Sequence, residues 1–191
     1  MLAMPGALPY EFHGYAIISD DDRIADARGR FPDCLKNEAD WTYFQAGLDD
    51  AGATLLGRRS HEASPNPKGR LRLVVSRSAA GLERRCDGWW WNPEGVSLAD
   101  ALDGVAPRNR VVAVPGGRDV FDLIGASGFA AFHLARAHGR SLPGGTGLFR
   151  ACEAGARAEG ILAAGGLCPS ATTWLDEANA VSLTVWRAGG R

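Results

Sequence analysis

The sequence contains few lysines and has no excess of charge of either sign. Its 21 basic side chains are balanced by 22 acidic ones, and only Lys36 and Lys68 are lysines. A formal net charge of -1 provides no broad basic field, which argues against extended recognition of nucleic acid or of an anionic membrane surface. Because the other cations are arginines, whose planar guanidinium matches carboxylate and phosphate, any anion site should be local.

Metal-ligand spacings and long apolar runs are also missing. The cysteines are widely separated, at Cys34, Cys86, Cys152 and Cys168, and the histidines are scattered, at His13, His61, His133 and His138. Neither set predicts a metal site or a catalytic triad. No stretch approaches the roughly eighteen apolar residues of a membrane helix, and MLAMPGALPYEF at the start lacks the features of a signal peptide. We therefore expect a cytoplasmic protein whose cysteines are reduced and which binds no metal.

The pattern of apolar segments predicts one α/β domain over residues 1–191, because strands and helices alternate and no linker divides the chain. Strands are expected at 13–19, 53–57, 71–76, 89–91, 110–117 and 132–137. Helices are expected at 39–48, 97–102 and 119–125, and the chain ends in an antiparallel strand pair at 172–176 and 181–186. These elements predict a three-layer sandwich around a mainly parallel sheet with an antiparallel C-terminal edge.

Asp40 is an acid on the apolar side of an expected helix. At about 100° per residue it shares a helix face with Phe44 and Leu48. One interpretation is structural: Asn37 caps the helix and Asp40 completes the cap. The other is functional, since a carboxyl group held in an apolar pocket has a raised pKa and can bind a substrate ring and help deliver a proton.

Three further motifs lie where strands are expected to end. GRRSHE begins at Gly57, GRLRLVVSR runs from Gly69 to Arg77, and VPGGRDVF spans 114–121. Each combines glycine, which lets a ligand approach the backbone, with arginine or a helix start that favours phosphate. Each alone also fits an ordinary turn with solvated arginines.

In their order and spacing, these motifs together with FPDCLKNEADWTYF resemble the dihydrofolate reductase family over residues 14–150. The resemblance implies an NADPH-dependent reductase in which Asp40 supports proton delivery to a pterin ring. Phe44 would pack against the substrate, Arg70 would pair with the carboxylate of its tail, and Ala16 would offer backbone groups to the nicotinamide. Gly116 and Gly117 would form a cis peptide against the cofactor. The implied cofactor-binding residues are Gly57, Arg58, Ser60, Ser76, Arg77, Gly116, Gly117, Arg118, Asp119 and Val120.

The chain departs from the family pattern at several places. Asp33 follows Pro32 where the family usually has tryptophan, Ala135 stands where a threonine normally bonds the acid, and Phe121 replaces a frequent tyrosine. The loop LPGGTGLF also resembles the reductase domain of riboflavin biosynthesis, which uses NADPH on a ribosylaminopyrimidine. A third alternative is a non-catalytic nucleotide-binding member of the fold.

The aromatic run Trp89 to Trp91 has two interpretations. It could stack a nucleobase, but alternation along a strand favours packing in the core or at an interface. Such packing is compatible with a homodimer.

Overall fold

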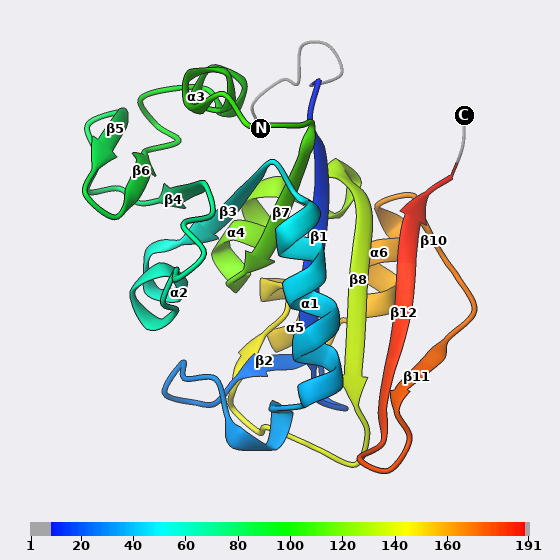
Figure 1. The fold of residues 1–191 in the computed structure, drawn as a ribbon. Coiled ribbons are helices and arrows are strands. Elements are labelled where there is room, and N and C mark those ends of the chain that lie inside the picture. The colour runs from blue at the N-terminus through cyan, green and yellow to red at the C-terminus, as the bar shows by residue number, and fades with distance from the viewer. Residues whose placement is uncertain (1–8, 190–191) are drawn as a thin grey trace.

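The computed structural model describes residues 9–189, which form one large sheet with helices on both faces (Figure 1). The first eight residues, which include most of the segment judged to lack a signal peptide, lie outside this range. The ten-stranded sheet has the following order: β10 (Leu167–Pro169), β12 (Val181–Ala188), β8 (Phe129–Ala137), β1 (Glu11–Ile18), β7 (Val111–Gly116), β3 (Ala53–Gly57), β4 (Arg72–Val75), β6 (Gly88–Trp91) and β5 (Leu82–Arg85), with β11 (Thr173–Asp176) paired to β12.

The direction of the strands confirms the expected sheet. Strand β1 runs parallel to β7 and β8, and β3 runs parallel to β7 and β4. Strand β12 is antiparallel to β8, β10 and β11, which gives the C-terminal antiparallel edge, and β5 adds a second antiparallel edge beside β6. A separate two-stranded sheet joins β2 (Arg23–Ala25) to β9 (Thr146–Gly147).

The helices form the two outer layers. The α-helices are α1 (Glu38–Asp50), α2 (Arg58–Ala63), α3 (Leu98–Val105), α4 (Arg118–Ile124), α5 (Arg150–Glu153) and α6 (Ala158–Ala164), and two short 3-10 turns are η1 (Asp33–Leu35) and η2 (Ala126–Gly128). Figure 1 shows α1 on one face of the sheet and α4 and α6 on the other. Both faces of the central strands are therefore covered, as in other parallel sheets.

Alternation along β1 explains how one strand serves both layers. Phe12 and Ile18 pack with Phe121 of α4 in the largest buried cluster. Tyr15 points to the opposite face and packs against Leu48 of α1. Successive strand residues point to opposite sides of a sheet, so the near-continuous apolar sequence of β1 fits its central position.

The tryptophans separate into packed and exposed groups. Trp90 and Trp91 of β6 are buried, which supports the packing interpretation of that run. Trp41 of α1 is 57% exposed although it is a large apolar residue. It touches Phe44 edge-on with ring centroids 5.7 Å apart, so it lies on the solvent side of the apolar face.

Candidate functional site

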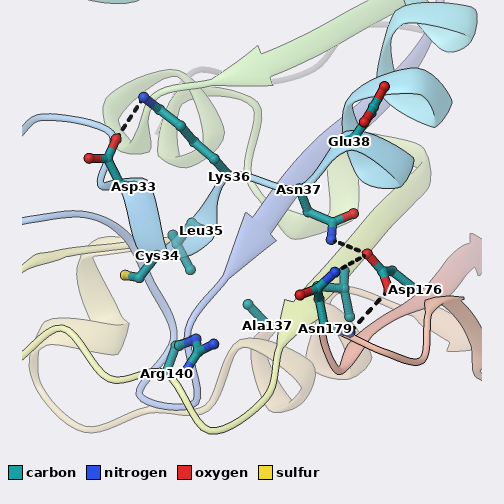
Figure 2. Close-up of a pocket in the computed structure, with 11 residues that line it drawn as sticks. Asp33, Cys34, Leu35, Lys36, Asn37, Glu38, Ala137, Arg140, Asp176 and Asn179 are labelled. Carbon is teal, nitrogen blue, oxygen red and sulfur yellow. Dashed lines mark hydrogen bonds and ion pairs between the residues drawn. The ribbon is translucent and has the colours of Figure 1, made fainter.

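The first turn of α1 is fixed by Asn37, which binds two partners. Its Oδ1 accepts a hydrogen bond from the Asp40 backbone at 3.0 Å, and its Nδ2 donates to Oδ2 of Asp176 at 2.8 Å. Asn179 also donates to Asp176, at 2.7 Å. Figure 2 shows this junction, in which Asn37 and Asn179 both point at Asp176. The expected cap by Asn37 is thus confirmed, whereas the Asp40 side chain does not complete it, and the cap is anchored to the C-terminal strand pair.

The Asp40 carboxyl group lies in a partly buried position. Burial raises its pKa from 3.8 to about 6, because a charged carboxylate loses solvation there. None of the hydrogen bonds formed by residues 9–189 involves this carboxylate. A carboxyl group with this pKa holds a proton in a useful fraction of molecules near neutral pH, and its oxygens remain free to bind a ligand.

A tyrosine and a histidine pack beside the position where the family pattern has threonine. Tyr43 lies one turn after Asp40 and packs against the cluster that contains Ala135. Its hydroxyl is 2.6 Å from Nδ1 of His133, whose ring stacks on Tyr15 at 4.4 Å. Burial lowers the pKa of His133 to about 4, so the imidazole is neutral at pH 7. This pair has no local sequence signal, because its two members are 90 positions apart in the chain.

The glycine turn lies at the carboxyl end of β7. The Gly116–Gly117 peptide is cis, as expected, and Gly116 has a φ of 95°. A Cβ added to Gly116 would lie 2.7 Å from the Phe121 ring, so only glycine fits there. A Cβ on Gly117 would meet only the Ser60 hydroxyl oxygen, at 4.0 Å. The structure therefore brings Ser60 beside the turn and leaves space over Gly117.

Strand β1 separates from β7 at the same end of the sheet, where the carboxyl ends of the parallel strands lie. Its pairing with β7 ends at Gly14, whereas its pairing with β8 continues to Ile18. Ala16 therefore lies where β1 has lost one neighbour. The start of α1 and the carboxyl end of β1 lie at the same end of the sheet (Figure 1), and Asp40 belongs to the first turn of α1. Ligands of open α/β sheets bind outside the carboxyl ends of the strands.

The expected phosphate-binding residues are at neighbouring strand ends. Gly57 pairs with Val75 in the register of β3 and β4, so α2 begins next to Ser76 and Arg77. Arg77 is exposed, and Arg58 is 3.9 Å from Glu62 in an exposed ion pair. Ser76 is buried, and its hydroxyl lies 2.9 Å from that of Ser78.

The three residues after the glycine turn have partners within the chain. Arg118 donates to Glu153 at 2.6 Å, and Asp119 accepts from Arg150 at 3.0 Å. Val120 is buried in the core. Any contact of this turn with a cofactor would therefore come mainly from the backbone.

Arg70 lies apart from this edge, next to the last turn of α1. Its Nε and Nη2 donate to Oδ1 of Asp49 at 2.9 and 2.6 Å. Asp49 is nine residues after Asp40, which corresponds to roughly 14 Å along a helix. The sequence analysis did not identify Asp49 as the partner of Arg70.

Two cavities have linings that include neither Asp40 nor Gly116. One of about 300 Å³ is bounded by η1, the start of α1 and the ends of β8 and β12 (Figure 2). Several of its polar side chains pair with one another, as in the 2.7 Å contact of Lys36 with Asp33. The other, of about 510 Å³, is lined by Asp49, Lys68, Arg70 and Arg108 at the amino end of β3.

Comparison with solved structures identifies the architecture. Dihydrofolate reductase from Enterococcus faecalis, complexed with NADP(H) and RAB-propyl, superposes with a TM-score of 0.66 at 18% identity, covering 94% of this chain and 97% of that one. The chain has the dihydrofolate reductase fold. A putative riboflavin biosynthesis protein from Shewanella sp. PV-4 gives 0.65 at 17% identity, covering 94% of this chain and 99% of that one.

A bifunctional protein shares the dihydrofolate reductase fold over part of its length. This diaminohydroxyphosphoribosylaminopyrimidine deaminase/5-amino-6-(5-phosphoribosylamino)uracil reductase from Thermotoga maritima gives a TM-score of 0.62 at 12% identity, covering 94% of this chain and 57% of that one. No family model and no curated protein matches the sequence. At identities of 12–18% the comparisons establish the fold.

Among residues 9–189, no group of three or more histidine, cysteine, aspartate or glutamate side chains is arranged to hold a metal ion. No helix in the same range is both long and apolar enough to cross a membrane.

Proposed function

We propose that the protein is an NADPH-dependent reductase of a dihydropterin, with Asp40 as the acid that orients the ring and supplies a proton. The observation that carries this proposal is the desolvated Asp40 carboxyl group, whose pKa burial raises to about 6, on the sheet edge that also carries the glycine turn. A general acid works best when its pKa lies near the operating pH. Its two unpaired oxygens match the adjacent ring nitrogen and amino group of a pterin.

The residues at this edge fit a dinucleotide. The open space over Gly117 allows close approach of a ligand, with the Ser60 hydroxyl beside it. Exposed Arg77 and Arg58 are near enough in the strand register to contact phosphate, and guanidinium groups favour the extra 2′-phosphate of NADPH. The nicotinamide side of the site would be lined by backbone groups of Ala16, Gly116 and Gly117. Gly57 and Val120 would stabilise the adjoining turns. NADPH would supply the hydride.

In this mechanism the chain itself performs three tasks. Phe44, one turn after Asp40, packs against the flat ring and helps exclude water, which strengthens electrostatic interactions in the site. Asp40 binds the ring and stabilises its protonated form. The rigid first turn of α1 keeps the carboxyl group in place while the ring is held against the glycine turn.

The test is a comparison of wild-type protein with Asp40→Asn in an assay of NADPH oxidation driven by dihydrofolate or a simpler dihydropterin. We expect the substitution to lower kcat/KM by about 100-fold or more, the usual range for a general acid. Asp50→Asn, at the exposed end of the same helix, is the matched control and should retain activity. Equal activity in wild type and Asp40→Asn would contradict the assigned role.

A riboflavin-type reductase is the second candidate. Ala135 favours it, because this residue stands where the family pattern has a threonine bonded to the acid, and a riboflavin-type reductase does not need an acid supported on that helix. In this case 5-amino-6-(5-phosphoribosylamino)uracil would support NADPH oxidation, and Asp40→Asn would have little effect. Binding of NADPH without turnover of either substrate class would instead indicate a non-catalytic nucleotide-binding protein.

A further inference from the structure

A second stripe of side chains runs along α1 beside Asp40 and Phe44. Trp41, Gln45 and Asp49 are spaced four residues apart, so they follow one side of the helix. Trp41 is exposed and borders the half-buried Phe44. A ring bound at Asp40 whose substituent extends along this stripe would bring that substituent to Asp49 and Arg70.

Asp49 and Arg70 form a hydrogen-bonded ion pair at the end of that stripe. Besides its two bonds to Asp49, Arg70 Nη2 donates to the Gln45 carbonyl at 3.4 Å. The Asn66 side chain forms two hydrogen bonds with the Arg70 backbone: it accepts from the N–H at 3.0 Å and donates to the carbonyl at 2.8 Å. Only 15% of the Arg70 side chain is exposed, so its guanidinium is held in one place by the protein.

The neighbouring cations also have partners. Lys68 Nζ donates to the second Asp49 oxygen at 2.6 Å, so both carboxylate oxygens are bound. Arg108 Nε donates to the Ala51 carbonyl at 3.1 Å and Nη2 contacts the Asp49 carbonyl, which satisfies backbone groups at the end of α1. Hydrogen bonds from Lys68 and Arg70 lower the pKa of Asp49, so it stays ionised at neutral pH.

We propose that Asp49 is a specificity-determining residue that holds Arg70 in an internal ion pair, so that the site favours ring substrates whose side chain carries no carboxylate. This inference rests on the proposed function for the nature of the ring. A substrate carboxylate that approached Arg70 would have to displace Asp49, which is tethered nearby, and would be repelled by it. Arg70 would thus not give a carboxylate tail the advantage that the family resemblance implies.

The experiment compares two substrates in wild type, Asp49→Asn and the control Asp50→Asn. One substrate is dihydrofolate, whose tail ends in carboxylates, and the other is a dihydropterin with an uncharged hydroxymethyl side chain. We expect Asp49→Asn to shift the ratio of the two kcat/KM values toward dihydrofolate by about twofold to fivefold, the range for one partly exposed ion pair. Asp50→Asn should leave the ratio unchanged.

A binding measurement that does not depend on turnover accompanies the assay. Calorimetric titration with p-aminobenzoylglutamate, which carries the tail without the ring, should show tighter binding to Asp49→Asn than to wild type. Arg70→Gln added to Asp49→Asn should remove the gain.

The outcomes separate the inference from the proposed function. If both rings are reduced but the ratio and the titration do not change in Asp49→Asn, the specificity role of Asp49 is wrong and the reductase stands. If neither ring is reduced while Asp49→Asn gains p-aminobenzoylglutamate binding, the role of Asp49 stands and the dihydropterin reductase is wrong.

Discussion

Asp40 should make the protein less stable at neutral pH than at acid pH, because its folded pKa is raised. The pKa of the Asp40 carboxyl group rises from 3.8 in the unfolded chain to about 6 in the folded protein. Between these values the folded state binds the proton more tightly, so stability falls as pH rises through the folded pKa. A shift of about two pKa units corresponds to roughly 3 kcal/mol or less of destabilisation, fully present above about pH 6.

Asp40→Asn removes this cost, so it should stabilise the protein by about 1–3 kcal/mol at pH 8 and by much less at pH 4. Urea unfolding of wild type and variant at both pH values measures the difference. His133 acts in the opposite direction, since its lowered pKa makes the fold lose stability as pH falls from about 6.5 toward 4, and comparison within each pH cancels that contribution. An equal gain at pH 4 and pH 8 would show that Asp40 is ionised or neutral at both.

The capping of α1 links the stability of a helix to the placement of the acid. Asn37→Ala removes the acceptor for the Asp40 N–H and the donor to Asp176, and we expect it to cost about 1 kcal/mol and to lower kcat/KM. Ser97→Ala is the matched control, because Ser97 caps α3 with a 3.1 Å bond from Asp100 far along the chain from the site. Both variants should lose similar stability by urea titration. An equal loss of activity in both would show that the Asn37 effect is not specific to Asp40.

The helices and strands with strong local patterns could be predicted from the sequence. The structure has β3 at Ala53–Gly57, as predicted, and α1 extends the predicted helix by one or two residues at each end. Strand β5 was missed because LERR has no apolar alternation and is ordered by pairing with β6. The partner of Arg70 was also missed, since it lies 21 residues away and depends on how α1 packs. Sequence patterns thus placed the elements and the acid, while contacts between elements required the structure.

For the chain as a whole, Asp22 connects three distant segments. This almost fully buried carboxylate, in the loop after β1, accepts from Arg136 of β8 at 2.8 Å and from the Ala158 N–H of α6 at 3.1 Å. Arg157 Nε lies 3.3 Å from it. A buried carboxylate with several donors is costly to disrupt, because its removal leaves the arginines without their counter-charge.

Asp22→Asn should destabilise the fold by about 3 kcal/mol, which for a chain of this size lowers Tm by roughly 6–12 °C. If residues 1–191 are one domain, the variant should still unfold in a single transition, with coincident curves from circular dichroism and from the fluorescence of tryptophans such as Trp90 in β6 and Trp186 in β12. Asp33→Ala breaks the exposed pair with Lys36 and should leave Tm unchanged. Two separated transitions would show that the part around β6 folds independently of β8 and β12, since Asp22 would then stabilise only the part that contains it.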